Sequence, residues 1–431
     1  MSNMKRYLLL LFLPLLFLTS CSSTKVEVKK YNLADTNITF GEYNFKNFHS
    51  AFRYLQPNEA YNLAETEQQK SLANALNLVT QNKLDDAADL LSKIKTENDS
   101  LQNLWVFIPT SYYYIRYNWE KYEEYVNIRN DIRQHYSDSI FAFYNDKPKF
   151  NIDFKEDSVV IPIKSHNGIP IIKIKINGKY YTFIIDTGCS RTLIGNNIVN
   201  ENNIIYDNKA VGVKTTDGSA TVYLSFLPEI DLKDIIISNI PVNVINKNDA
   251  WKVKFLFITF LQADGFIGWD LLHRFDFTID YKNKLLTLRK PVEKNIEQKN
   301  LFWYQRPIIK FYTKNNYPLL FFFDTGSDMS SINTASVMRT LGVDTNKLKK
   351  RTERVHGLNN WIKKHTYKYN NFECFTLSNN DMIYLAVNKS FLENIPTDSS
   401  PIVFDGTLGS NWFKNKVVRV DMKNGLFEIS E

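Results

Sequence analysis

Asp186-Thr187-Gly188 and Asp324-Thr325-Gly326 are two copies of one tripeptide, and each copy ends a run of large apolar residues. The run before the first copy is YYTFII at residues 180–185, and the run before the second is LLFFF at residues 319–323. Apolar runs of this kind predict buried strands. A carboxylate at the end of a buried strand is costly unless it is hydrogen-bonded or protonated, so the two carboxyl groups indicate a shared acid–base centre.

The two tripeptides belong to a long internal repeat. The segment Pro-Ile-Ile-Lys begins at Pro170 and again at Pro307, and the two tripeptides follow at an offset of 138 residues. Two further elements recur at an offset of 141 residues: DGFIG and DGTLG at residues 264–268 and 405–409, and DYKNKL and DMKNGL at residues 280–285 and 421–426. Four elements in one order at nearly constant spacing predict two copies of one structural unit.

These elements resemble those of aspartic proteases of the pepsin and retropepsin type, over roughly the C-terminal two-thirds of the chain. In that family each lobe supplies an Asp-Thr/Ser-Gly loop, and a hydrophobic-hydrophobic-Gly segment packs behind it. The second element is FIG at residues 266–268 and, with threonine in the first place, TLG at residues 407–409. The resemblance implies a mainly β, bilobal body of two double-psi β-barrels, with the cleft between the lobes.

The resemblance also implies that Asp186 and Asp324 are the catalytic residues of an endopeptidase. Two carboxyl groups about 3 Å apart share one proton, so the ionised member activates a water while the protonated member hydrogen-bonds the scissile carbonyl. This chemistry needs no cofactor and no metal ion. The resemblance implies that the two threonines cross-brace the loops through hydroxyl-to-backbone hydrogen bonds, and the residues expected to support the loops are Thr187, Gly188, Thr325, Gly326 and Ser327.

The residues after the two tripeptides depart from the usual family pattern. Cys189 stands where alanine or serine is common, and because a thiol is a weak hydrogen-bond donor we expect the Asp186 anion to be less stabilised. Ser327 is expected to hydrogen-bond the outer oxygen of Asp324. We expect Asp328 to face solvent rather than the carboxyl pair. These departures predict a mildly acidic to near-neutral pH optimum.

Each repeat also contains a candidate flap, a hairpin that would close over a substrate. In the first repeat, an Asp217-Gly218 turn lies between two alternating arms within residues 211–223, which is a strong hairpin signal. The matching stretch of the second repeat, residues 354–361, carries His356 and Gly357. Both candidate turns follow their aspartate at nearly the same distance, so position favours a flap in both repeats.

The N-terminal residues predict export and lipid attachment. Lys5 and Arg6 precede the apolar run 8–18, which is too short to span a bilayer and has the layout of a signal peptide over residues 1–20. The run ends in LTSC at residues 18–21, which resembles a bacterial lipobox, so Cys21 is the predicted lipidation site. The alternative is an ordinary signal peptide that happens to contain a cysteine. Residues 22–25 hold no acidic residue, so we expect a bacterial cell-envelope location, at the outer membrane and facing the periplasm.

Residues 21–150 predict a helical region. Residues 71–79 and 84–94 have helical periodicity and are separated by a break at 80–83, a pattern that resembles one tetratricopeptide helix hairpin. A second pair is expected from residue 104 to residue 126. Such helices could recruit a protein partner, present substrate, or hold the protease away from the lipid.

The remaining composition adds few functional signals. We expect the first lobe at residues 151–290, a linker at 291–306 and the second lobe at 307–431. The formal charge of +7 is spread over 431 residues without a dense basic run, so we expect no nucleic-acid partner. The histidines show no metal-ligand spacing, and beside Cys21 the two other cysteines, Cys189 and Cys374, are expected to be free thiols.

Two functions from different classes remain open. The leading one is an envelope-anchored aspartic endopeptidase that acts on a peptide or protein substrate. The alternative is a catalytically inactive lipoprotein that keeps the bilobal cleft as a peptide-binding module. Both aspartates, both threonines and both glycines are present, which favours the enzyme, because a binding cleft has no need of paired carboxyl groups.

Overall fold

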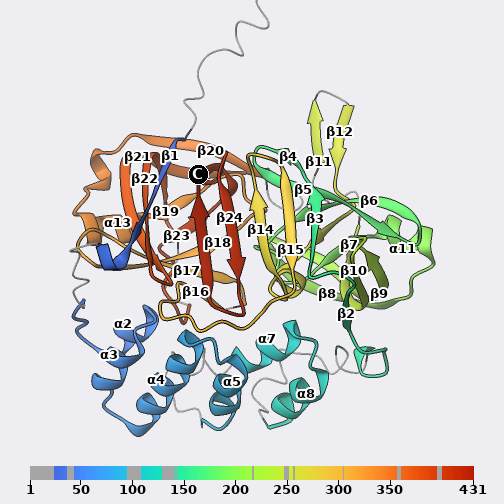
Figure 1. Ribbon diagram of the computed structural model, residues 1–431, viewed down its shortest axis with the longest axis horizontal. Helices are drawn as coiled ribbons and strands as arrows, with labels where there is room; N and C mark the ends of the chain where they lie inside the picture. The colour runs from blue at the N-terminus through green and yellow to red at the C-terminus, as the bar shows by residue number, and fades with distance from the viewer. Residues whose placement is uncertain are drawn as a thin grey trace, which may run out of the picture.

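Two β lobes stand side by side, and a row of short helices lies across one side of both (Figure 1). The computed structural model describes residues 24–35, 43–94, 108–128, 140, 143–215, 218–246, 252–255, 258–303, 305–356, 361–395 and 400–431. The predicted signal peptide and Cys21 therefore lie outside the described residues. Among the described residues, no helix has the length and apolar character needed to cross a membrane.

Lobe 1 is built around six strands that close into a barrel. The pairing runs β10, β7, β13, β6, β5, β9 and back to β10. These strands are β5 (Ile169–Ile176), β6 (Lys179–Ile185), β7 (Leu193–Gly195), β9 (Gly218–Asp231), β10 (Ile235–Ile245) and β13 (Gly265–Ile267). β5 and β6 form the hairpin that leads to Asp186, and Asn177 and Gly178 in its turn both adopt a positive φ, 46° and 81°.

Lobe 2 repeats this barrel with its own six strands. The pairing runs β22, β19, β23, β18, β17, β21 and back to β22. These strands are β17 (Pro307–Tyr312), β18 (Pro318–Phe323), β19 (Ser331–Asn333), β21 (Trp361–Ser378), β22 (Asp381–Glu393) and β23 (Gly406–Leu408). The predicted repeat is therefore a repeat of structure, strand by strand.

Further elements sit at matching places in the two lobes. A helix follows β7 and β19, and a short turn of helix follows β13 and β23. These elements are α11 (Asn196–Asn202), α13 (Thr334–Leu341), α12 (Trp269–Leu272) and the 3-10 helix η4 (Ser410–Trp412). Edge strands extend lobe 1, namely β2 (Asn151–Phe154), β4 (Lys164–His166) and β8 (Tyr206–Thr215). Other short elements have no counterpart among the described residues of the opposite lobe. They are the hairpin of β11 (Lys252–Phe255) and β12 (Ile258–Gln262) and the 3-10 helices η1 (Leu33–Asp35) and η3 (Thr345–Lys347).

Two edge strands of lobe 2 correct the predicted boundaries. β16 (Leu301–Trp303) pairs with β17, although residues 291–306 were expected to be a linker. β1 (Val26–Asn32) pairs antiparallel with β22, although it falls in the region expected to be helical. Both strands are short, so their residues carry only a weak strand pattern. The partner of β1 is remote in sequence, and the partner of β16 follows it across a turn. The third edge strand, β20 (Lys350–His356), pairs with β21.

A five-stranded antiparallel sheet joins the lobes. Its order is β25-β24-β14-β15-β3, and β14 of lobe 1 pairs directly with β24 of lobe 2. The Arg419 guanidinium donates to both oxygens of the Asp276 carboxylate at 2.8 Å, which ties β24 to β14. The strands are β3 (Ser158–Pro162), β14 (Asp276–Asp280), β15 (Leu285–Arg289), β24 (Val417–Asp421) and β25 (Leu426–Ser430).

The helices confirm a helical region and extend it. Both predicted pairs are present, and an unpredicted pair precedes them. In the described residues of this region, the helices of the three pairs are α2 (Phe48–Arg53), α3 (Pro57–Asn62), α4 (Glu67–Thr80), α5 (Leu84–Ser92), α7 (Ile108–Ile115) and α8 (Trp119–Ile128). The break between α4 and α5 contains Asn82 with a φ of 61°, and the break between α7 and α8 contains Tyr117 with the same φ. The two breaks therefore use one left-handed residue each to reverse the chain.

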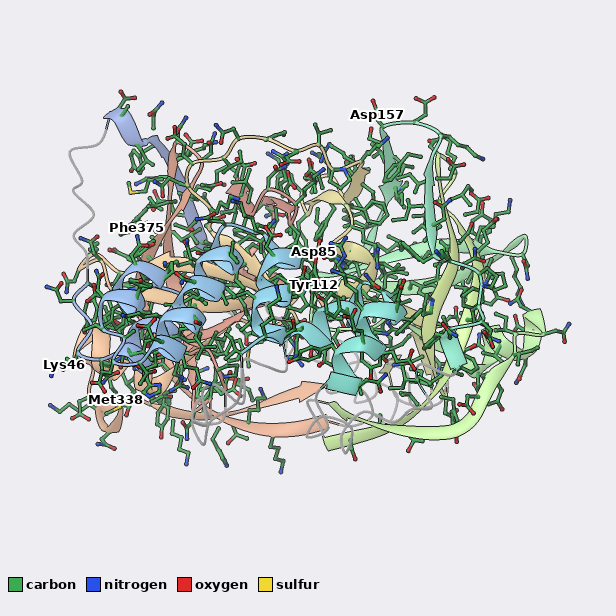
Figure 2. All side chains as sticks on the ribbon, turned by 90° about the horizontal axis from the view of Figure 1, so that it is seen from below. Lys46, Asp85, Tyr112, Asp157, Met338 and Phe375 are labelled. Carbon is green, nitrogen blue, oxygen red and sulfur yellow. The ribbon has the colours of Figure 1, made fainter. Side chains whose placement is uncertain are left out.

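The helices pack directly on both lobes. Figure 2 shows the row crossing them, with Tyr112 near its middle. On lobe 1, the Tyr117 hydroxyl, between α7 and α8, donates to the buried Asp270 carboxylate on α12 at 2.8 Å. On lobe 2, the buried Lys310 ammonium donates to the Leu55 carbonyl oxygen at 3.2 Å. Because β1 precedes the helices in the chain and lies in the sheet of lobe 2, the helices are not a spacer between lobe 2 and the N-terminal segment.

Candidate active site

The two aspartates occupy equivalent positions at the ends of buried strands. Asp186 follows β6 and Asp324 follows β18. Behind each, the predicted hydrophobic-glycine segment runs parallel to that strand, as β13 beside β6 and β23 beside β18. The Asp186 amide donates to the Ile267 carbonyl oxygen, and the Asp324 amide to that of Leu408, both at 3.0 Å. The strand pairing therefore fixes the backbone of each aspartate.

The two loops are held together by their threonines. The amide of Thr187 donates to the Thr325 hydroxyl, and the amide of Thr325 donates to the Thr187 hydroxyl, both at 3.0 Å. Each hydroxyl in turn donates across to the other lobe, Thr187 to the Phe323 carbonyl oxygen at 2.8 Å and Thr325 to that of Ile185 at 2.7 Å. Both threonines are fully buried. The cross-brace that the resemblance implied is present.

The two carboxyl groups meet between the lobes. A Cβ atom built on Gly188 would lie 2.5 Å from Asp324 Oδ1, and one built on Gly326 would lie 2.4 Å from Asp186 Cγ. Each carboxyl group therefore packs against the backbone of the opposite loop, where only glycine leaves room. Each also accepts the amide of its own glycine, at 2.9 Å from Gly188 and 3.0 Å from Gly326.

This environment favours a shared proton. Burial and the neighbouring Asp324 carboxyl raise the pKa of Asp186, and burial also raises the pKa of Asp324. The loop amides and a hydrogen bond between the two carboxyl groups act in the opposite direction on Asp324. Two such groups titrate as a unit, so one proton between them is the natural state over an intermediate pH range.

Arg306 is a residue near the pair that sequence reasoning missed. It is exposed, it immediately precedes β17, and its guanidinium lies 4.9 Å from the centre of the Phe322 ring. Its positive charge acts against burial and lowers the pKa of both Asp186 and Asp324. One sequence signal could have found Arg306: it lies directly before the repeated Pro-Ile-Ile-Lys segment, close in the chain to the strand that leads to Asp324. Arg306 is also the last residue of the predicted linker 291–306, so sequence reasoning did not place it near the carboxyl pair.

The expectation for Ser327 was wrong. Its hydroxyl donates to the Met329 carbonyl oxygen at 3.0 Å, and among the hydrogen bonds of the described residues none joins this hydroxyl to Asp324. Cys189 does the same in the other loop, since its thiol donates to the Arg191 carbonyl oxygen at 2.9 Å. The side chain after each glycine points back into its own loop. The Asp186 anion is stabilised instead by the Cys189 amide, at 3.0 Å from Oδ1.

The other predicted residues are placed as follows. Asp328 is exposed, as expected, and Cys189 and Cys374 are free thiols. Hairpins occupy both candidate flap positions: β8 pairs with β9 up to Gly218, and β20 pairs with β21 up to His356. Asp217 and Gly357, in the two turns, lie outside the described residues. The structure therefore confirms the two hairpins.

Comparisons with known proteins found similarity to an aspartyl protease family and to a solved aspartic proteinase. Residues 172–263 match the family model of the gag-polyprotein putative aspartyl protease, a segment that contains Asp186-Thr187-Gly188. A search of curated proteins gave no match. Among solved structures, an aspartic proteinase from Irpex lacteus is similar with a TM-score of 0.37 and 12% sequence identity, covering 63% of this chain and 97% of that chain. The family match supports an aspartic-protease fold for lobe 1.

Proposed function

We propose that this protein is an aspartic endopeptidase whose catalytic pair is Asp186 and Asp324. The observation that carries the proposal is the meeting of two partly buried carboxyl groups, each packed against the glycine of the opposite loop. A pair of carboxyl groups buried together without a chemical use is costly, because one of them must stay protonated. Perturbed carboxyl groups at an interface between lobes are typical of catalytic sites.

The proposed reaction needs only a water molecule and one shared proton. The ionised carboxylate takes a proton from the water as its oxygen attacks the scissile carbonyl carbon, while the protonated carboxyl donates a hydrogen bond to the carbonyl oxygen. The tetrahedral intermediate then collapses, the C–N bond breaks, and the leaving nitrogen receives a proton from the pair. The threonine cross-brace keeps the two carboxyl groups at a fixed separation during these steps.

The test is cleavage of a peptide library by the chain without its predicted signal peptide. We expect wild type to cleave and Asp186→Asn to bind peptides without cleaving them. Peptide binding by wild type without any cleavage, over the whole accessible pH range, would reject the enzyme and support the alternative, a peptide-binding module. Asp153→Asn is a matched control, because Asp153 is an exposed residue of β2.

Envelope anchoring is the second part of the proposal and rests on the lipobox-like LTSC at residues 18–21. β1 begins at Val26, so about five residues, reaching at most about 17 Å, would separate a lipid on Cys21 from lobe 2. The helices lie on the opposite side of the molecule from the start of β1 (Figure 1). A lipid on Cys21 would thus hold lobe 2, not the helices, next to the bilayer. Metabolic labelling with a fatty-acid analogue should tag wild type and spare Cys21→Ala; equal labelling of both would reject the anchor.

The helix pairs have less free surface for a protein partner than a separate tetratricopeptide-like domain would have. Their likeness to tetratricopeptide hairpins stays a prediction. Because α4 and α7 lie against β16 and the residues that follow it, part of the helical surface is already occupied by lobe 2.

A further inference from the structure

The loop that carries Asp186 inserts a charged side chain into the helical region. Arg191 lies five residues after Asp186, and only 5% of it is exposed. Its guanidinium carbon lies 4.4 to 6.0 Å from the centres of four aromatic rings, those of Tyr114, Tyr117, Trp119 and Tyr144. All four rings belong to the segment that precedes lobe 1, and three of them to α7, α8 and the turn between them. Arg191 also donates to the Tyr114 carbonyl oxygen at 3.2 Å.

A buried carboxylate completes this cluster. Asp270, on α12, is fully buried, and its Oδ2 atom lies 3.8 Å from Arg191 Nε. It accepts hydrogen bonds from the Thr192 amide at 2.9 Å, the Thr192 hydroxyl at 2.8 Å and the Tyr117 hydroxyl at 2.8 Å. The ion pair joins the catalytic loop, through Arg191, to α12, through Asp270. The Tyr117 hydroxyl adds the helical region to the same cluster, so the three elements are fixed against one another.

A short path leads from Arg191 to the carboxyl group of Asp186. The Arg191 carbonyl oxygen accepts the Cys189 thiol at 2.9 Å, and the Cys189 amide donates to Asp186 Oδ1 at 3.0 Å. The Arg191 backbone also packs against Gly268, where a Cβ atom would lie 2.6 Å from the Arg191 carbonyl carbon. The position of Arg191 therefore sets the position of the amide that stabilises the Asp186 anion.

The second loop shows that the charges are not needed by the loop itself. Met329 stands in the place of Arg191, and the pair Ser330 and Asn411 stands in the place of Thr192 and Asp270. Ser330 donates its amide and its hydroxyl to Asn411 Oδ1, both at 2.7 Å. The same hydrogen-bond plan is thus made with neutral residues. The charged version occurs in the lobe whose active-site loop contacts α7 and α8 directly.

We propose that Arg191 is a positioning residue through which the docking of α7 and α8 holds the Asp186 loop in its catalytic conformation. The helical region is then a built-in part of the catalytic unit of lobe 1. This proposal rests on the proposed function, because a catalytic conformation requires catalysis. The link between Arg191 and the Asp186 carboxyl group can be tested without cleavage, by titration of the pair.

The test compares Arg191→Met, which introduces the residue of the second loop, with Arg274→Met. Arg274 is the matched control because it sits in the same aromatic surroundings, 4.7 Å from the Tyr117 ring and 4.2 Å from the Phe150 ring, and donates to the Ile115 carbonyl oxygen at 3.3 Å. It follows α12 and not the catalytic loop. Both variants remove one guanidinium from the same interface, and only Arg191→Met removes the link to Asp186.

The first readout is the titration of the catalytic pair, followed by carboxyl carbon NMR of protein labelled at aspartate and assigned with Asp186→Asn. Arg191→Met loosens the Cys189 amide from Asp186, so the apparent pKa of the pair should rise, whereas Arg274→Met should leave it unchanged. The second readout is cleavage: kcat should fall at least about tenfold in Arg191→Met with little change in KM, and stay near wild type in Arg274→Met.

Other titrating groups are controlled by this design. Asp324 and Arg306 act on Asp186 in every variant, and the charged or titratable groups around Arg191 are Asp270, Tyr114, Tyr117, Tyr144, Arg274 and Cys189. Arg274 shares Tyr117 and Asp270 with Arg191, so a general electrostatic effect of removing a cation beside these two groups appears in both variants.

The double variant R191M/D270N separates positioning from charge balance. It copies the neutral pair of the second loop and removes the unpaired buried carboxylate, so its melting temperature should recover towards wild type, and it carries the test if Arg191→Met does not fold. The pKa of the pair should stay raised and kcat low, because the link to the helices is absent. A wild-type titration in both Arg191 variants, or an equal shift in Arg274→Met, would overturn the proposal. Absence of cleavage by wild type would reject the proposed function and leave the titration to decide on Arg191.

Discussion

The Asp186 loop and the Asp324 loop share one backbone plan and differ in what stands behind them. In both, the residue after the glycine donates to the carbonyl oxygen two residues on, and a buried hydroxyl, of Thr192 or Ser330, accepts the amide of Gly268 or Gly409, at 3.1 and 2.8 Å. Behind the first loop lies a buried ion pair shared with the helices; behind the second lies a neutral amide. Symmetry is kept where the two carboxyl groups meet and is lost where other parts of the chain dock.

The helices contact lobe 2 in a different way. There they touch β17, through Lys310 and Leu55, and the buried carboxylate of Asp405, which accepts the Tyr54 hydroxyl at 3.5 Å. Burial raises the pKa of Asp405 to about 6 and lowers the pKa of Lys310 to about 7. None of these groups belongs to residues 324–330. In the part of the chain described, the helical region thus makes polar contacts with the Asp186 loop itself, through Arg191. On lobe 2, its polar contacts with Lys310 and Asp405 lie outside the Asp324 loop.

The largest effect expected from the shared part of the plan is that of a methyl group in either loop. Gly188→Ala and Gly326→Ala each place a Cβ atom within 2.6 Å of the opposite carboxyl group, so each should lower kcat by about 100-fold or more. The two losses should be similar because the contact is symmetric. Peptide cleavage rates measure this, with folding checked by melting temperature and with Gly342→Ala, at the end of α13, as the control, because a Cβ atom there meets nothing within 4 Å. A loss in only one of the two variants would show that the carboxyl groups do not face each other symmetrically.

A smaller and again equal effect is expected from the threonines. Thr187→Val and Thr325→Val each remove a buried hydroxyl that donates one hydrogen bond and accepts another, so each should lower the free energy of unfolding by about 1–3 kcal/mol. Urea denaturation measures the change. Thr187→Ser and Thr325→Ser keep the hydroxyl and are the matched controls. Serine variants as unstable as the valine variants would assign the effect to the lost methyl group.

Arg306 should shift the pH profile without abolishing activity. Its charge lowers the pKa of both aspartates, so Arg306→Gln should raise both values and move both limbs of the bell-shaped rate profile to higher pH. Arg306→Lys keeps a positive charge and should stay closer to wild type. The profile of kcat/KM reports the free enzyme. A shift to lower pH would contradict the assigned sign.

The smallest effect is expected from making the two loops alike at Cys189. Cys189→Ser should give a hydroxyl that donates to the Arg191 carbonyl oxygen, as Ser327 does to that of Met329. The sequence alone predicts that the thiol leaves the Asp186 anion less stabilised than a hydroxyl would, but the thiol donates to the Arg191 carbonyl oxygen and not to the carboxyl group. We now expect the pH profile of Cys189→Ser to overlay that of wild type. A clear downward shift of the acidic limb would restore the earlier expectation.

Local signals account for what the sequence could predict. The apolar runs before each Asp-Thr-Gly, the Asn177-Gly178 turn and the repeated glycine segments are each readable within a few residues, and they suffice to place the two barrels and the pair. What could not be predicted depends on contacts between remote segments. β1 pairs with a strand more than 300 residues away, and Arg191 meets Asp270 and rings from residues 114–144 only after folding. The hydroxyl of Ser327 was misassigned because its direction is set by the turn of the loop.

The central claim is that Asp186 and Asp324 act as one unit, and a cycle of asparagine variants tests it most directly. Cleavage rates are measured for wild type, Asp186→Asn, Asp324→Asn and the double variant, with folding checked by melting temperature. Because the two carboxyl groups share one proton, each single change should abolish cleavage as fully as both together. A folded single variant that retained most of its activity, or losses that multiplied in the double variant, would contradict a shared pair.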